Sequence, residues 1–337
     1  MFVPAPVFLS RRRLLAWSAL GAAGTVASGL SLAQSAGNWP DKPIRMVVAG
    51  PAGGSADILA RLIGDGLGRA LGQPVVVDTK PGGLGAIAMD AFMGSARDGH
   101  AFMVGVNSLV TELPHTLKPR YDPFTAIKPL VRLTNGGLVL VSNASLPARN
   151  LAELLAYVKE RPGRISYASY TPGTSSHING LLLSRLTGLE MQHIGYKGSP
   201  PALQDILGGQ VTLMFDGLGT SLPLIQSGKL RAYAVVATKR IPQLPEVPTM
   251  TELGFPDISH VAWLCLWTLP DAPAAAQQRV RAEVLRIITQ PEVRDRLAAT
   301  GLEVPQGAAT PEELMAGNQK DHAAVGRLLT SIGYRPE

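Results

Sequence analysis

The sequence has few of the residues on which disulfide and metal chemistry depend. It contains one cysteine, Cys265, in 337 residues, so it can form no internal disulfide and has no C-x-x-C pair. The six histidines are scattered, and none belongs to an H-x-x-H or H-E-x-x-H pattern. We therefore expect no metal ion and no other cofactor. The apolar neighbours of Cys265 favour a buried, inert thiol.

Nucleotide-binding and nucleic-acid-binding patterns are also missing. No loop matches G-x-x-x-x-G-K-[ST] or G-x-G-x-x-G. The net charge is +6, but three of the arginines lie in an N-terminal segment that we expect to be removed. Without residues 1–33, 28 basic residues remain against 25 acidic ones, and no cluster of Lys or Arg follows. Binding to nucleic acid is not expected.

The N-terminus has the pattern of an export signal. Arg11, Arg12 and Arg13 form a basic region, and the apolar stretch 14–32 follows. The stretch ends in Ser31-Leu32-Ala33, which places small residues at the positions that signal peptidase reads and predicts cleavage after Ala33. The arginines fit a twin-arginine signal as well as an ordinary secretory one. We expect residues 1–33 to be a signal peptide and the protein to be periplasmic.

Short apolar runs alternate with helical periodicity along the rest of the chain, which indicates an α/β protein with mostly parallel sheets. The predicted strands are Ile44–Ala49, Pro74–Asp78, Ala101–Val106, Leu138–Ser142, Arg164–Ser169, Met191–Tyr196, Val211–Phe215, Arg231–Val236 and Val261–Leu269.

The alternation occurs twice, which predicts two lobes. We expect residues 39–140 and 260–337 to form the first lobe and residues 141–259 the second. The chain would cross between them near Val139–Ser142 and near Ile258–Ala262, and the C-terminal helices would pack on the first lobe. Two crossings make a hinge, and ligands bind at the carboxyl ends of such strands.

The turn after the first predicted strand, "AGPAGGSADILARL", is rich in glycine and opens a helix. Gly53 and Gly54 allow a ligand to approach the backbone closely. Ser55 is a candidate N-cap, and the amides of Gly54, Ser55 and Ala56 would point into the crevice, where an anion binds well.

Three later turns repeat this arrangement. In the first, Thr174, Ser175 and Ser176 follow a Pro-Gly pair and begin a helix. In the second, Ser199 is a candidate cap before Pro200. In the third, Asp216 ends a strand; it would suit a ligand ammonium group, a bound water or a helix cap. Several such turns predict a cleft lined with helix N-termini that holds a small carboxylate.

A competing hypothesis is an exported hydrolase that uses Ser175 or Ser176 with His177. The sequence Gly173–His177 is not G-x-S-x-G, and adjacency in sequence is not triad geometry. We therefore expect a binding protein and not an enzyme.

Several segments resemble one family closely. They are "WPDKPIRMVVAGPAGGSADILARLI", "PGGLGAIAMD", "DGHAFMVG", "YASYTPGTSSHINGLLL", "YKGSPPALQDILGGQVTLMFD" and "GKLRAYAVVATKRIPQLPEVPTMTELGFP". In this order they are similar to the Bug family, the periplasmic solute receptors (TctC-like) of tripartite tricarboxylate transporters.

The resemblance implies a type II-like periplasmic-binding-protein fold, in which two lobes close on a small carboxylate such as an organic acid or amino acid. It implies that the protein is a monomer without catalytic residues and that the membrane subunits of a transporter are its partners. A ligand sensor that signals to a membrane kinase is the other hypothesis. The implied ligand-binding residues are Pro51, Ala52, Gly53, Gly54, Ser55, Gly173, Thr174, Ser175, Ser176, His177, Tyr196, Gly198, Ser199 and Asp216.

The chain departs from the family pattern at two loops. The first loop usually reads Pro-Phe-Pro-Pro-Gly-Gly, whereas this chain has Gly50 and Ala52 in place of bulkier residues. The second loop carries Tyr170 where small residues are usual, so we add Tyr170 to the predicted site. These departures predict a reshaped pocket rather than a different fold.

Overall fold

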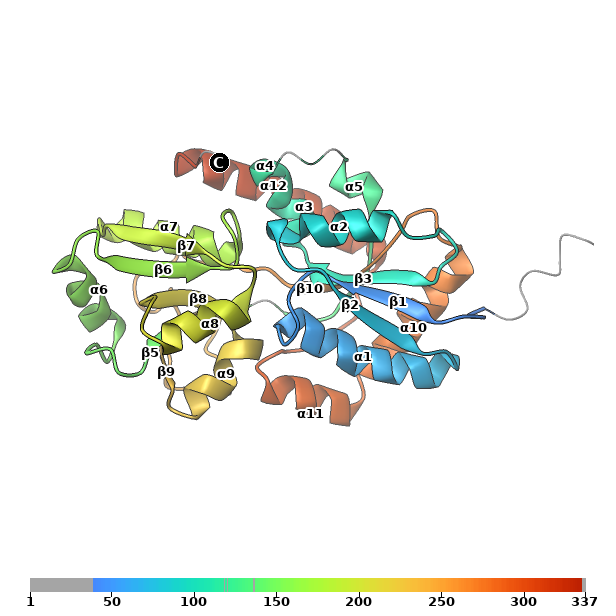
Figure 1. The fold of residues 1–337 in the computed structure, drawn as a ribbon, viewed down its shortest axis with the longest axis horizontal. Coiled ribbons are helices and arrows are strands. Elements are labelled where there is room, and N and C mark those ends of the chain that lie inside the picture. Colours follow the sequence, from blue (N-terminus) through green and yellow to red (C-terminus); the bar gives the residue numbers. More distant parts are fainter. Residues whose placement is uncertain (1–38, 118, 120, 136, 335–337) are drawn as a thin grey trace, which may run out of the picture. The chain divides into compact units, whose positions relative to one another are not determined.

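The computed structural model describes residues 39–117, 119, 121–135 and 137–334, so the predicted signal peptide, residues 1–33, lies outside the described residues. From Lys42 onward the chain forms one unit, built from two sheets and the helices that cover them (Figure 1). Within the described ranges, no helix is both long enough and apolar enough to cross a membrane.

The first sheet has the strand order β2-β1-β3-β10-β4. Its strands are β1 (Ile44–Val48), β2 (Val75–Thr79), β3 (Ala101–Val106), β4 (Lys128–Arg132) and β10 (Leu264–Thr268). Strand β10 is antiparallel to both neighbours, and the other four strands run in one direction. Helices α1 (Ser55–Leu71) and α10 (Ala274–Ile288) pack together on one face, and α2 (Ala86–Met93) packs on the other.

The second sheet repeats this plan with the order β7-β6-β8-β5-β9. Its strands are β5 (Leu138–Asn143), β6 (Ile165–Ser169), β7 (Met191–Gly195), β8 (Leu213–Gly217) and β9 (Leu230–Val236), of which β5 alone is reversed. Helices α6 (Leu151–Lys159) and α7 (Ser175–Thr187) share one core cluster. Helices α8 (Ser199–Leu207) and α9 (Leu218–Gln226) share the cluster on the other face. The predicted α/β architecture with two mixed, mostly parallel sheets is therefore present.

Five short helical elements and the long helix α12 are the remaining helices of the described residues. They are the 3₁₀ turn η1 (Gly83–Gly85), α3 (Ser108–Thr111), α4 (Leu113–Thr116), α5 (Pro123–Ala126), α11 (Pro291–Ala299) and α12 (Pro311–Ser331).

Strand β4 is an element that the sequence did not predict. It contains Pro129 and ends in Arg132, and it forms the edge of its sheet. Proline is tolerated there because one side of an edge strand needs no hydrogen bonds. Its residues are neither alternating nor uniformly apolar, so the pattern was too weak to indicate a strand.

The first crossing lies earlier than expected. Strand β4 ends at Arg132 in the first sheet, and β5 begins at Leu138 in the second. The predicted crossing near Val139–Ser142, and with it the predicted lobe boundary after residue 140, therefore falls inside β5. The second crossing lies between Ile258, which is buried in the core of the second lobe, and Trp263, which is buried in that of the first.

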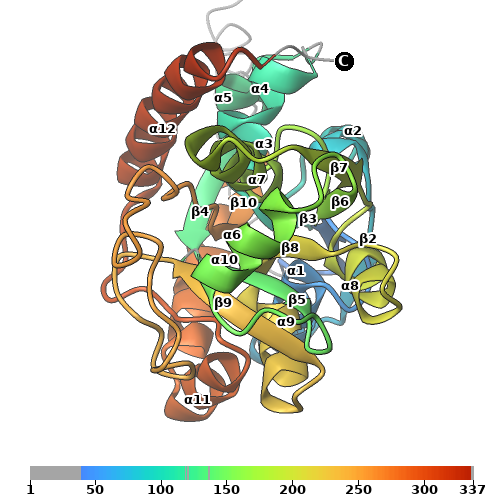
Figure 2. The same ribbon diagram turned by 90° about the vertical axis from the view of Figure 1, so that its left-hand side faces the viewer.

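Helix α12 belongs to both lobes, whereas the sequence placed all C-terminal helices on the first. Leu314 is buried in the core of the first lobe. Val325 and Leu329, about three turns later, are buried in the core of the second. Figures 1 and 2 show α12 running past α3 and α4 toward α7. The helix therefore connects the lobes in addition to the two crossings.

Candidate functional site

A cavity of about 1140 Å³ lies between the two sheets and is lined by loops from both lobes. The first turns of four helices line it: α1 through Ser55, α7 through Ser175, α8 through Ser199 and α9 through Leu218. The first amides of a helix have no partner within the helix and carry the positive end of its dipole. Four such ends around one cavity make it a favourable place for an anion.

The glycine turn before α1 is closed by its own residues. The N-cap is Gly54, in extended conformation with no side-chain cap, and not Ser55 as predicted from the sequence. The amide of Gly53 donates to Asp57 Oδ2 at 2.9 Å, and Arg61 forms an ion pair with Asp57 at 3.0 Å. Ser55 is the first residue of the helix and lines the cavity, whereas Asp57 does not line it.

The turn before α7 is held by the side chain of its N-cap, Thr174. The Thr174 hydroxyl donates to the carbonyl of Thr171 at 2.8 Å and accepts from the amide of His177 at 3.4 Å. Thr174 and Ser175 line the cavity. Ser176 does not, because it is fully buried and its hydroxyl donates to the carbonyl of Phe215 at 2.6 Å.

His177 is part of the core of the second lobe and not of a catalytic group. Its Nδ1 accepts a hydrogen bond from the amide of Gly173 at 2.9 Å, and its ring lies 4.0 Å from that of His193. Burial, together with the charge of His193, lowers the pKa of His177 to about 3. The imidazole is therefore neutral and fastens the loop. Since Ser176 and His177 have other partners, the hydrolase hypothesis has no base on a serine.

Asp216 supports the loops without lining the cavity. Its carboxylate is fully buried and accepts from Tyr170 at 2.8 Å, from Thr220 at 2.8 Å and from Ser221. Burial raises the pKa of Asp216, and these hydroxyls oppose that change by stabilising the charge. The carboxylate therefore holds the start of α9 through side-chain hydroxyls and is not its helix cap, since the N-cap is Gly217.

The two predicted tyrosines differ in position. Tyr170 lines the cavity, but its hydroxyl is used twice, as a donor to Asp216 and as an acceptor from the amide of Gly217 at 2.5 Å. Its ring can therefore shape the pocket, while its polar end is occupied. The Tyr196 hydroxyl donates to Asp205 at 2.6 Å, and Tyr196 does not line the cavity among the described residues.

The start of α8 also differs from the prediction. Gly198 is the N-cap, so Ser199 and Pro200 occupy the first two helical positions. The Ser199 hydroxyl donates to Thr220 Oγ1 at 2.8 Å, which joins it to the hydroxyls around Asp216.

Eight of the fifteen predicted site residues line the cavity. They are Pro51, Gly54, Ser55, Tyr170, Thr174, Ser175, Gly198 and Ser199. The other seven lie behind or beside these loops: Ala52, Gly53, Gly173, Ser176, His177, Tyr196 and Asp216.

Sequence reasoning missed the charged residues of the cavity. The described lining includes five cationic side chains, those of Arg132, Lys197, Lys239, Arg240 and Arg294. It includes two acidic ones, Asp295 and Glu303. The excess of positive charge agrees with the helix termini in favouring an anion. No short pattern marks these residues, because they come from separate elements of both lobes. Among the described residues, no group of His, Cys, Asp and Glu side chains is placed to hold a metal ion.

The two lobes touch at glycines around the cavity. A Cβ placed on Gly198 of the second lobe would lie 2.5 Å from Cγ of Pro51 in the first. One placed on Gly219 would lie 2.6 Å from the Ser55 hydroxyl, and Gly173 packs equally closely on Thr116. The lobes are therefore in contact around the cavity, where glycines receive side chains of the opposite lobe.

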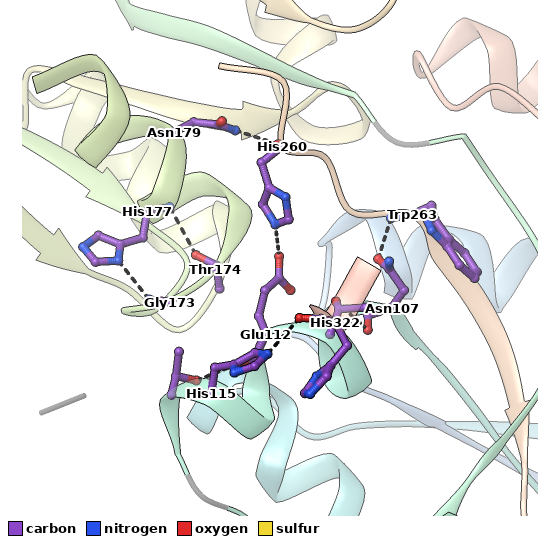
Figure 3. A network of polar contacts seen from close by, with 12 residues as sticks. Asn107, Glu112, His115, Gly173, Thr174, His177, Asn179, His260, Trp263 and His322 are labelled. Atoms are coloured by element: carbon purple, nitrogen blue, oxygen red, sulfur yellow. Dashed lines mark hydrogen bonds and ion pairs between the residues drawn. The ribbon is translucent and has the colours of Figure 1, made fainter. Parts of the chain in front are cut away.

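A second connection between the lobes runs through the later crossing segment (Figure 3). His260 Nε2 lies 2.5 Å from Oε1 of Glu112, which is buried between α3 and α4. The carbonyl of His260 accepts from Asn179 of α7 at 2.7 Å. Burial alone would lower the pKa of His260, but the hydrogen bond and charge of Glu112 raise it above its ordinary value. The pair therefore joins the crossing to both lobes.

Known proteins are similar to this chain in sequence and in fold. Residues 59–333 match the TctC model, described as the tripartite tricarboxylate transporter family receptor. BugT from Bordetella pertussis is 37% identical over 242 residues, which is 71% of this chain and 74% of BugT.

Two solved structures are similar over most of the chain. The periplasmic binding protein BugD superposes with a TM-score of 0.84 at 30% identity, covering 89% of this chain and all of BugD. Rpa4515 from R. palustris, solved with adipate, has a TM-score of 0.84 at 28% identity and covers 89% of this chain and 100% of its own.

These comparisons confirm the predicted periplasmic-binding-protein fold and the resemblance to the Bug family. The family and its solved members are solute-binding proteins, which also confirms the expectation that the chain is not an enzyme. The chain belongs to the TctC family of tripartite tricarboxylate transporter receptors.

Proposed function

We propose that this protein is an exported receptor that captures a small carboxylate between its lobes and delivers it to the membrane subunits of a tripartite tricarboxylate transporter. The observation that carries the proposal is the convergence of four helix N-termini on one cavity between two lobes. An acid held by backbone amides and hydroxyls needs no dedicated counter-ion. The adipate bound to the related Rpa4515 protein supports a carboxylate as the ligand.

Closure of the lobes would serve transport by giving the ligand-bound protein a conformation that differs from that of the ligand-free protein. A ligand that contacts both lobes binds the closed form better than an open one, so it shifts the population toward closure. The membrane subunits can then select the closed receptor. Periplasmic export agrees with the signal peptide that the sequence predicts and with the family.

The proposal is tested with protein purified from the periplasm, whose N-terminus is first determined by mass spectrometry. The ligands are mono-, di- and tricarboxylates, each paired with its neutral amide, and amino acids, each paired with its cationic amide. Binding is followed by thermal shift and calorimetry. A ligand at a hundred times its Kd stabilises the folded state by about 2.7 kcal/mol. We expect acids to bind and their amides to fail. If no acid binds, or if amides bind equally well, the proposal is wrong.

A further inference from the structure

Arg132 lies opposite the glycine turn across the first sheet. Strand β4 runs in the same direction as β1 and β3, because β10 is antiparallel to both β3 and β4. The ladder pairs Arg132 with Cys265, and Cys265 with Gly105. The amide of Ala49 bonds to the carbonyl of Val104, directly before Gly105. Arg132 and the start of the glycine turn therefore stand level at the same edge of the sheet.

The guanidinium of Arg132 is held in place without a carboxylate partner. It lies over the ring of Trp263 with Cζ 4.9 Å from the ring centroid, and its Nε donates to the carbonyl of Thr134 at 3.3 Å. No described residue forms an ion pair with it. Asp321 of α12 attracts it only at longer range. Its two terminal nitrogens have no hydrogen-bond partner among the described residues, and Arg132 lines the cavity.

The other cations of the cavity are less suited to hold a ligand. Among the described lining residues, Lys197, Lys239, Arg240 and Arg294 are exposed, while Arg132 is partly buried. Arg240 is also paired with Glu252 at 3.0 Å. A charge in bulk water is screened and adds little, whereas a partly buried cation without a counter-ion attracts an anion strongly. Burial accordingly lowers the pKa of Arg132 from its ordinary value, although arginine remains charged.

The sheet sets the distance between the two anion-binding positions. Three strand spacings separate β1 from β4, which amounts to about 14 Å. The helix amides reach into this span from one end and the arginine side chain from the other. The two groups therefore approach the cavity from strands three positions apart, which suits the two ends of one short ligand.

We propose that Arg132 binds a second acidic group of the ligand, so that this receptor selects compounds with two acidic ends over those with one. This inference rests on the proposed function, since it assumes that the first acidic group is held at the helix N-termini. The planar guanidinium matches a carboxylate in a bidentate pair, which a lysine cannot reproduce. The stacking on Trp263 and the bond to Thr134 reduce the entropy that binding would cost.

The experiment compares ligand pairs that differ in one charge. Succinate, glutarate and adipate are each matched with their monoamides, and the Kd ratio of monoamide to diacid is measured for the native protein and three variants. A charged hydrogen bond contributes about 1.5–3 kcal/mol, so the ratio should be roughly 10 to 100 for the native protein at the best chain length. We expect Arg132→Gln to lower the ratio to near 1 by weakening diacid binding alone.

Two further variants separate charge from packing. Arg132→Lys keeps the positive charge but cannot form the bidentate pair with a carboxylate, so it should give an intermediate Kd ratio. Lys159→Gln removes an exposed cation of α6 that lies outside the cavity and should leave the ratio unchanged. Arg132→Gln should weaken a monoamide little, whereas a purely structural role of Arg132 would weaken both members of a pair equally. Thermal melting identifies any variant that fails to fold.

The outcomes separate the two proposals. If the native protein binds monoamides as tightly as diacids, or if the ratio is the same in Arg132→Gln, Arg132 does not bind a second acid and this inference is wrong while the receptor function stands. If the native protein binds no carboxylate at all, both proposals are wrong. A ratio that falls in the order native, Lys, Gln supports the inference.

Discussion

Replacing Gly198 by alanine should hold the lobes apart. The added Cβ would lie 2.5 Å from Cγ and 2.6 Å from Cδ of Pro51 in the opposite lobe. Carbon atoms prefer separations of about 3.5–4.0 Å, so the added Cβ would overlap Pro51 by about 1 Å while the lobes keep their present contact. Gly198 also has φ 114° and ψ −177°, a region that other residues adopt at a cost of roughly 1–3 kcal/mol. The first effect opposes closure, and the second opposes folding.

The two effects can be measured separately. We expect Gly198→Ala to raise the Kd of the tightest carboxylate by at least about tenfold, equivalent to 1.4 kcal/mol, because closure now requires the lobes to shift. X-ray scattering with saturating ligand should give a larger radius of gyration than for the native protein. The strain should appear independently as a lower melting temperature of the ligand-free variant.

The double variant Pro51→Ala/Gly198→Ala is the decisive control. Pro51→Ala removes Cγ and Cδ and leaves Cβ at 3.8 Å, an ordinary contact. The double variant should therefore regain most of the affinity while keeping the lower melting temperature. Gly209→Ala, with φ 74° and no atom within 4 Å of the added Cβ, should lose stability without losing affinity. Native-like affinity in Gly198→Ala, or no recovery in the double variant, would refute the steric explanation.

Three further predictions concern buried groups. The pKa of His177 is about 3 in the folded state against about 6.5 in the unfolded state, so the unfolded state binds a proton first as the pH falls. The free energy of unfolding should therefore decrease below pH 6.5, by roughly 3 kcal/mol at pH 4.5. Urea titrations should show this slope, and His177→Asn should reduce it. Glu112 raises the pKa of His260 in the folded state above its ordinary value of about 6.5. Protonated His260 therefore adds to the free energy of unfolding below about pH 6.5, and this stabilisation is lost as the pH rises through the folded pKa. His260→Gln should reduce this loss of stability at higher pH in the same titrations. Ser176→Ala should cost about 1 kcal/mol of stability with unchanged affinity, whereas Ser175→Ala should alter affinity and leave stability nearly unchanged, as calorimetry and melting can check.

The helix N-termini could be predicted from the sequence because their causes are local. Glycine, proline and hydroxyl residues after an apolar run specify the turn with little help from the rest of the fold. The starts of α1, α7 and α8 were placed within one residue, and the small errors at Ser55 and Ser199 come from glycines that cap in their place. Such one-residue differences are usual at helix ends.

The chemistry of individual side chains depended on tertiary neighbours and could not be predicted. Asp216 looked like a cleft carboxylate, but Tyr170 and the hydroxyls of α9 surround it. His177 looked like a cleft residue, but it turns inward to Gly173 and His193. No sequence pattern marks Arg132 as a residue of the cavity. It lies there because the edge strand β4 pairs with β10, which joins residues more than 130 positions apart.

The contacts between the lobes predict where the lobes would separate if the protein opens to admit a ligand. On one side, α12 contributes Leu314 to one core and Val325 to the other, and His260 is bonded to Glu112 and Asn179. Separation there would expose apolar side chains and leave the Glu112 charge without its partner, which is costly. On the other side, Pro51 and Ser55 pack against Gly198 and Gly219, and Gln243 donates one hydrogen bond to the carbonyl of Ala298 at 2.9 Å. Separation there breaks van der Waals contacts and one hydrogen bond that water can replace, so the lobes should part at the glycine turn and pivot near His260.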